Sequence, residues 1–515
     1  MPSPSATGAV LGTLFACLIL CAGCMSSPAA QTAPASSGTV AAAFDALAAE
    51  PQYQHATWGV LVVDLANNTT LYGKNPDAML MPGSTTKCFS SAAALAALGP
   101  DHRFETPVYT VNDTLVLVAS GDPTLGGRTR PDGTVDFTNI DHGDANALGG
   151  APLTPEDPLG GLDDLARQVK ASGIASARDV LVDDRVFETT DLGKEYVLSP
   201  MIVNDNLIDI TVAGAEAPGG NATVRTRPET ALFRVVSNVT STSGVPADLT
   251  VEPAGPGVIA VSGTVPAGAL ENRTFAVPDP AAFGRTLFIE ALRRQGVGVS
   301  ANATGPNPDS GLPASYAGAP KVASFVSPSF AEDVKLTLKV SQNYHADIYV
   351  LLLGAANGTR TFADGMARMA PLLRGHGVDT GALSLVDGEG SDGNRVSPRA
   401  AVQLLAGVAA SPDAAAFANA LPVLGVDGTL ADSIAKDSPA VGKVRAKTGT
   451  TIGIDALAGR PIVWNKALAG YADCASGRRV AFALCVNNVP VDDVAGALAV
   501  GNDLAALAAA IRQGY

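Results

Sequence analysis

The chain has 515 residues, of which 47% are hydrophobic and 16% are charged. This is the composition of a globular protein, and the length predicts two or three domains rather than one. The formal net charge of -15 offers no basic surface that could neutralise phosphates, which excludes nucleic acid as an expected partner.

An apolar segment near the start of the chain predicts export. Residues 8–23 are almost wholly apolar, and the run ends sharply at Cys24. Because such a run is too short for a stable membrane-spanning anchor, we expect residues 1–24 to be a signal peptide. The basic residues usual in a signal peptide are missing, since no Lys or Arg precedes the apolar run. The protein is therefore expected to be exported and to work outside the cytoplasm.

The end of this segment leaves several outcomes open. Residues 20–24, Leu-Cys-Ala-Gly-Cys, resemble a lipoprotein box in which Cys24 is lipidated and anchors the protein to a membrane. Plain cleavage and a retained anchor are the alternatives, because Cys21 stands where an aliphatic residue is usual. Residues 25–41 are rich in Ser, Ala and Pro and are expected to form a flexible linker.

Cysteines and histidines predict neither a disulfide framework nor a metal site. Three of the six cysteines lie in the apolar N-terminal segment, and the others are Cys88, Cys474 and Cys485. Cys88 is interpreted as a small buried residue. The five histidines show no metal-ligand spacing, so no metal or other cofactor is expected.

The first chemical motif follows a predicted helix at 40–49 and a predicted strand at 58–64. Pro82 and Gly83 stop the chain just before Ser84, and residues 90–98 favour a helix, so Ser84 lies at a helix N-terminus. Lys87 then stands one turn away with its amine near the hydroxyl. A serine becomes a nucleophile only when a base removes its proton, and a lysine can do so if burial lowers its pKa. On its own, the motif would be interpreted as a helix cap beside a solvated lysine.

The second motif, Ser341-Gln342-Asn343, follows an amphipathic run at 330–340. Its spacing lets a loop direct a hydroxyl and an amide into one cleft. Ser341 is predicted to relay a proton to a leaving amine, and Asn343 is predicted to hold the peptide group of a substrate. Alone, this tripeptide would be interpreted as a polar turn between helices.

The third motif, Lys447-Thr448-Gly449, lies in an alternating segment that predicts an edge strand. Lys447 and Thr448 offer a cation and a hydroxyl for a carboxylate, and Gly449 allows substrate backbone to approach closely. The backbone N–H groups of Ser84 and Thr450 are predicted to form an oxyanion hole. Alone, the motif would indicate only a solvated strand edge.

Together and in this order, the three motifs resemble the signature of penicillin-binding proteins and class A β-lactamases. The chain is most similar to the class C low-molecular-mass penicillin-binding proteins, the S13 D-Ala-D-Ala carboxypeptidases. This resemblance covers most of the chain after residue 40. It includes further segments of that family at 121–125, 182–187, 204–206, 394–398 and 425–430.

The resemblance implies an α/β (α+β) fold with a penicillin-binding or β-lactamase-like catalytic domain, in which helices surround an antiparallel sheet. That domain is expected at 42–103 and 325–515. Strand-rich accessory domains are expected to be inserted at 104–324 and to supply no catalytic side chain.

The implied function is that of a serine D-Ala-D-Ala carboxypeptidase or endopeptidase, which acts on cell-wall-type peptides through an acyl-enzyme on Ser84 and is inhibited by β-lactams. A serine esterase, a β-lactamase-like hydrolase and a non-catalytic envelope-binding homologue are the alternatives. Two departures from the family bear on substrate preference rather than on reaction type. Residues 387–392 read Asp-Gly-Glu-Gly-Ser-Asp where Asp-Gly-Ser-Gly-Leu-Ser is common, and residues 460–466 look inserted after the third motif.

Overall fold

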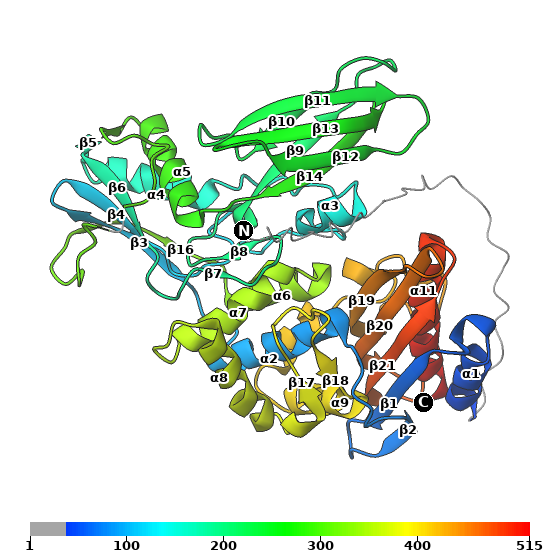
Figure 1. Ribbon diagram of the computed structural model, residues 1–515. Coiled ribbons are helices and arrows are strands. Elements are labelled where there is room, and N and C mark those ends of the chain that lie inside the picture. The colour runs from blue at the N-terminus through cyan, green and yellow to red at the C-terminus, as the bar shows by residue number, and fades with distance from the viewer. Residues whose placement is uncertain (1–37, 309) are drawn as a thin grey trace, which may run out of the picture.

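The structure is a computed structural model, and it describes residues 38–308 and 310–515. The predicted signal peptide, Cys24 and most of the predicted linker lie outside the described residues. The rest of the chain forms several sheets and helices, with strands from both ends of the sequence meeting in one sheet (Figure 1).

A five-stranded antiparallel sheet brings the two ends of the chain together. Its order is β19-β20-β21-β1-β2. These strands are β1 (Thr57–Asp64), β2 (Thr70–Lys74), β19 (Val444–Asp455), β20 (Arg460–Asp473) and β21 (Arg479–Pro490). The central pair runs from Thr57 opposite Asn487 to Asp64 opposite Val480. Nearly all of β1 is buried because both faces of the sheet are covered.

One face of this sheet packs against α1 (Thr39–Ala48) and α11 (Val494–Gly514), which lie together at the right of Figure 1. By length and composition α11 could cross a membrane, but its apolar residues pack against the sheet. Val60, Leu468 and Leu484 face this layer, and Leu61, Ala469 and Ala483 face the other side. This alternation follows from the two-residue period of a strand.

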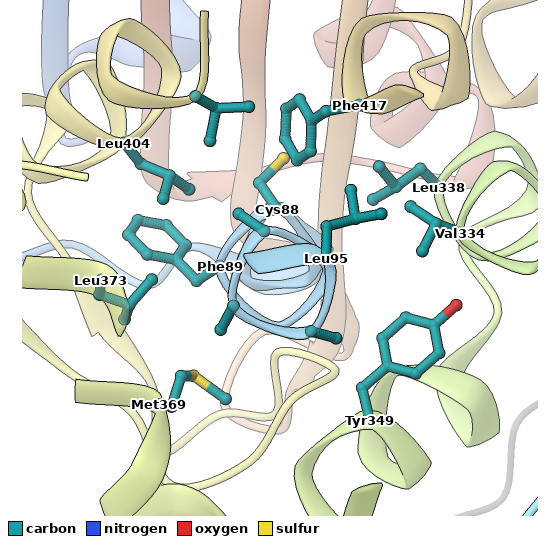
Figure 2. Packing of buried hydrophobic residues seen from close by; sticks show 14 of the residues in the cluster. Cys88, Phe89, Leu95, Val334, Leu338, Tyr349, Met369, Leu373, Leu404 and Phe417 are labelled. Atoms are coloured by element: carbon teal, nitrogen blue, oxygen red, sulfur yellow. The ribbon is translucent and has the colours of Figure 1, made fainter. Parts of the chain in front are cut away.

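Helices form the opposite layer around α2 (Lys87–Leu98). They are α6 (Phe330–Val340), α7 (Asn343–Ala355), α8 (Phe362–Gly375), α9 (Pro398–Ala409) and α10 (Ala414–Ala420). Figure 2 shows Phe89 and Leu95 of α2 surrounded by apolar side chains from these helices. Each fully buried Leu or Phe contributes about 1.5–3 kcal/mol. Cys88 is 2% exposed in this core, which confirms its interpretation as a small buried residue.

In the sequence, a strand-rich region lies between the two segments that form this sheet and its helices. This region has a second core of its own. One sheet has the order β16-β3-β4-β6 and consists of β3 (Glu105–Val111), β4 (Thr114–Val118), β6 (Asp179–Asp183) and β16 (Lys321–Val326). It packs with α4 (Gly160–Ala171) and α5 (Pro280–Arg294).

Two three-stranded sheets complete this region at the top of Figure 1. They are formed by β9 (Leu207–Ala213), β10 (Thr223–Arg227) and β14 (Leu270–Ala276), and by β11 (Arg234–Thr242), β12 (Asp248–Pro253) and β13 (Val258–Pro266). The region also reaches into the helical layer, because Phe187, Leu198 and Ile202 belong to the core around α2.

Candidate active site

Ser84 sits in a short 3-10 turn, Gly83–Thr86, that runs directly into α2. Gly83 has a φ of +51°, and a Cβ on it would lie 2.5 Å from Nδ2 of Asn465 and 3.0 Å from the backbone nitrogen of Thr450. Only glycine therefore lets this turn lie so close to β19 and β20. Asn487 of β21 holds Met81, two residues before Gly83, since it accepts from the N–H of Met81 at 2.8 Å and donates to its carbonyl at 3.2 Å.

Lys87 links the first motif to the second. Its Nζ lies 2.8 Å from Oγ of Ser84, 2.6 Å from Oδ1 of Asn343 and 2.9 Å from the carbonyl oxygen of Glu389. The side chain is fully buried, and burial lowers its pKa, although the carboxylates of Glu389 and Asp347 act in the opposite direction. A lowered pKa gives the amine a free lone pair more readily, which a base for Ser84 needs.

Lys447 links the third motif to the second in the same way. Its Nζ donates to Oγ of Ser341 at 2.9 Å and to the carbonyl of Thr448 at 2.9 Å. Burial, and then the neighbouring charge of Lys87, hold the pKa of Lys447 well below its ordinary value. Ser341 ends α6 with a φ of 68°, in the left-handed region, and this turns its hydroxyl toward Lys447.

The strand that carries the third motif packs directly on the Ser84 turn. A Cβ on Gly449 would lie 2.2 Å from the carbonyl oxygen of Pro82 and 3.2 Å from the N–H nitrogen of Thr85. The close approach of the Ser84 turn therefore requires glycine at position 449, apart from any need for substrate access. Thr448 donates from Oγ1 to Oγ1 of Thr429 at 2.8 Å.

All the predicted site residues therefore meet at one place. Contacts join Ser84, Lys87 and Asn343 on one side and Ser341, Lys447 and Thr448 on the other, and Gly449 and Thr450 adjoin the turn that carries Ser84. Their individual catalytic roles stay predictions.

A pocket of about 300 Å³ opens beside Ser341 and Asn343. The inserted region supplies much of its wall, including Asp144, Lys194 and Tyr196, and Glu389 also lines the pocket. Burial, and then the charge of Asp141, raise the pKa of Asp144 to about 6. The pocket is therefore polar and rich in carboxylates.

Motif reasoning missed several of these residues. Thr429 lies in a segment noted only for its family resemblance, Glu389 lies in a segment noted as a departure from the family, and Asp144 and Lys194 lie in the inserted region. Glu389 carried a signal, because it stands where the family commonly has serine.

A comparison with protein-family models identifies the chain. The model of the D-Ala-D-Ala carboxypeptidase 3 (S13) family matches residues 40–510. The chain belongs to this S13 family. The resemblance inferred from the three motifs is thereby confirmed.

Curated relatives of this S13 protein agree with the family match. It is 32% identical over 450 residues to a D-alanyl-D-alanine carboxypeptidase from Actinomadura sp. (strain R39). The match covers 81% of this chain and 77% of the relative. It is 23% identical over 470 residues to D-alanyl-D-alanine carboxypeptidase DacB of Haemophilus influenzae, over 85% of this chain and 86% of that relative.

The fold of this S13 protein is that of a solved penicillin-binding protein. The crystal structure of penicillin-binding protein 4 (dacB) from Haemophilus influenzae matches with a TM-score of 0.65 at 22% identity, over 87% of this chain and 95% of that one. A second structure of the same protein, complexed with a β-lactam, has the same TM-score at 20% identity, over 89% of this chain and 97% of that one. The predicted fold class, with its strand-rich accessory sheets, is confirmed.

Proposed function

We propose that this protein is a serine-type D-Ala-D-Ala carboxypeptidase that acts through an acyl-enzyme on Ser84. The observation that carries the proposal is the contact of 2.8 Å between Nζ of Lys87 and Oγ of Ser84, made by a lysine whose pKa burial lowers. Membership of the S13 family and a carboxypeptidase relative at 32% identity support a serine carboxypeptidase hydrolase over the other classes considered.

In the first half of the reaction, Lys87 accepts the proton of the Ser84 hydroxyl as Oγ attacks the carbonyl carbon of the penultimate D-Ala. The N–H groups of Ser84 and Thr450 stabilise the negative oxygen that forms. When the C–N bond breaks, the proton held by Lys87 passes through Ser341 to the leaving D-Ala amine, and the hydroxyl of Ser341 accepts a hydrogen bond from Lys447. The acyl group is then bonded to Ser84.

In the second half, water attacks the ester and releases the shortened peptide and the free serine.

Before the first half begins, Lys447 and Thr448 bind the terminal carboxylate of the substrate. A carboxylate beside Lys447 favours its charged form, which offsets the lowering of its pKa by burial. Substrate with a free C-terminus therefore adds a negative charge to that of Asp144, which acts on this lysine in the same direction.

A β-lactam presents a strained amide to the same serine, so it acylates Ser84 in place of the peptide. This expectation agrees with the solved relative that carries a bound β-lactam. The decisive experiment is incubation with labelled penicillin followed by mass spectrometry of peptides, with Ser84→Ala as the control. An adduct on the peptide that contains Ser84 supports the proposal, and an adduct elsewhere or none on a folded sample contradicts it.

The protein acts outside the cytoplasm, where peptides of the cell wall are found. Lipidation and membrane anchoring through Cys24 are a finer proposal, supported by the sequence around that residue. Labelling cells with a radioactive fatty acid tests it, because label should appear in the wild type and be absent from Cys24→Ala.

The domain division is also a proposal, with a catalytic domain of 42–103 and 325–515 and an inserted region of 104–324. Its support is the sheet that joins both ends of the chain and the separate core of the inserted region. Limited proteolysis should cut near the two junctions before it cuts within either part.

A further inference from the structure

Gln342, the residue between Ser341 and Asn343, reaches into the inserted region. Its side chain is buried, and its Nε2 donates to Oδ1 of Asp141 at 2.9 Å and to Oδ2 of Asp205 at 3.1 Å. Its Oε1 accepts from the backbone N–H that follows Asn343, at 2.9 Å. Both polar atoms of this side chain therefore have partners, and the acceptors of its amide are carboxylates of the inserted region.

Asp205 lies in a turn with an unusual backbone. Asn204, Asp205 and Asn206 have φ values of 52°, 56° and 55°, so three successive residues occupy the left-handed region. Asn and Asp tolerate this conformation better than other side chains with a Cβ, but it remains strained. Strain of this kind persists where the surroundings over-determine the backbone, and it concentrates at functional sites.

The Asn204–Asn206 turn contacts the second motif on both sides of Asn343. Besides the bond to Gln342, Asp205 accepts on Oδ1 from Nε2 of His345 at 2.9 Å. Asn206 donates from Nδ2 to the hydroxyl oxygen of Tyr344 at 2.8 Å. One turn of the inserted region thus holds three residues of the segment that carries Ser341 and Asn343.

Buried charges fix Asp205 in place. Arg128 donates from Nη2 to Oδ2 of Asp205 and from Nη1 to Oδ2 of Asp141, both at 2.7 Å. Nε2 of His142 lies 2.7 Å from Oδ2 of Asp205, and its Nδ1 lies 2.5 Å from Oδ1 of Asp209. Burial by itself lowers the pKa of His142, but the carboxylates of Asp209 and Asp141 raise it to about 10.

This cluster includes three possible metal ligands, Asp141, His142 and Asp205, which lie close together. They do not fit a cation site, because the guanidinium of Arg128 already bridges the two carboxylates. Both ring nitrogens of His142 are also directed at carboxylates. The charges neutralise one another, and the cluster serves as a rigid support.

We propose that the Asn204–Asn206 turn is a positioning element for the acylation of Ser84, with Asp205 acting through Gln342. The inference rests on the proposed function. Oγ of Ser341 lies 2.9 Å from Nζ of Lys447, and Oδ1 of Asn343 lies 2.6 Å from Nζ of Lys87. A shift of the segment that carries Ser341 and Asn343 therefore breaks both contacts at once. The turn thereby affects the reaction by holding Ser341 and Asn343 in place.

Acylation by a fluorescent penicillin tests the proposal in the full chain, with the first-order acylation rate constant measured separately from non-covalent binding. Asp205→Asn and Gln342→Met should each lower that rate constant at least about tenfold, the scale expected when a reacting group is misplaced. The matched control is Asp183→Asn, which changes a similarly buried carboxylate of the inserted region whose bonds go to Arg185 and Tyr316, away from the turn. It should stay within about threefold of the wild type.

A double-mutant cycle separates positioning from general damage to the fold. In a Ser341→Ala background the cost of Asp205→Asn should shrink at least about threefold, because one of the two contacts that the turn maintains is already lost. Equal losses for Asp205→Asn and Asp183→Asn, or the same loss with and without Ser341, overturn the proposal. If Asp205→Asn does not fold, Gln342→Met decides alone, since it removes all three hydrogen bonds of the side chain and keeps its size.

The two proposals can also be told apart. If the wild type is acylated and the rate constants of Asp205→Asn and Gln342→Met are unchanged, only the role of the turn is overturned. Folded wild-type protein that penicillin does not acylate overturns the proposed function, and the role of the turn falls with it.

Discussion

Lys194 and Glu389 form an ion pair, with Nζ of the lysine 2.5 Å from Oε1 of the glutamate. The same Nζ lies 2.5 Å from Oδ2 of Asp347 and 3.1 Å from Oδ2 of Asp387. The backbone carbonyl of Glu389 in turn accepts from Lys87. One cation of the inserted region therefore offsets part of the negative charge of three carboxylates that act on the proposed base.

Lys194→Met should shift the pH dependence of acylation to higher pH. These carboxylates raise the pKa of Lys87 against the effect of burial, and without Lys194 their field at Lys87 becomes stronger. Below its pKa, each unit of upward shift reduces the free-base fraction of Lys87 about tenfold. Acylation by a fluorescent penicillin, measured from pH 6 to 10, checks this.

The control for this variant is Lys321→Met, which removes an exposed lysine paired with Glu105. Its profile should follow that of the wild type. A Lys194→Met profile with the same midpoint as the wild type would show that Lys194 has no electrostatic effect on the base.

Lys447→Ala should weaken cleavage of peptides with a free C-terminal carboxylate more than cleavage of the matching amidated peptides. The reason is that the buried amine gains a counter-charge only from the free acid. Loss of one such contact costs on the order of a hundredfold in rate. The ratio of kcat/KM for the two peptides is the measurement, and the amidated peptide is the internal control. An unchanged ratio in the variant would remove the carboxylate role from Lys447.

His345 should stabilise the fold most strongly at low pH. Burial by itself lowers the pKa of this imidazole, but the carboxylates of Asp333 and Asp205 raise it to about 10. A group whose folded pKa is raised contributes stability that is complete below its unfolded pKa of about 6.5 and is lost as the pH rises through the folded value.

The difference in unfolding free energy between wild type and His345→Gln should therefore be largest near pH 6 and should shrink toward pH 10. Urea unfolding at several pH values measures it. Comparing two variants at each pH cancels the opposite trend that the buried lysines add. A difference that grows with pH would mean that His345 is buried in its neutral form.

The geometry of the first motif could be predicted from the sequence because it is local. Residues three apart share a face of a helix, so the contact between Ser84 and Lys87 follows from four consecutive letters and a helix start. The order of the three motifs predicted the family, and the family supplied the fold. The closing of the catalytic sheet by both ends of the chain was implied in the same way.

The support around the site could not be predicted, because its partners are distant in sequence and follow no period. Lys194 meets Asp347 across 153 residues, and Asp205 meets His345 across 140. His142 and His345 show no metal-ligand spacing in the sequence. Their carboxylate partners come from other parts of the chain, so these contacts leave no local pattern. The left-handed turn at 204–206 appeared in the sequence only as a segment of family resemblance.

Gly83→Ala should abolish most acylation, by displacing the turn that carries Ser84 from β19. A Cβ at this position would lie 2.5 Å from Nδ2 of Asn465 and 3.0 Å from the backbone nitrogen of Thr450, which is the proposed oxyanion donor. Gly133→Ala is the matched control, because its φ of +82° is also left-handed but nothing lies within 4 Å of the added Cβ. Both variants carry the same kind of backbone strain, about 1–2 kcal/mol. Gly83→Ala alone should lower the acylation rate about a hundredfold, since a displacement near 1 Å has this effect on a reacting group. Comparable rates in the two variants, with both shown to be folded by thermal unfolding, would mean that the contact between the Ser84 turn and β19 does not set the reaction geometry.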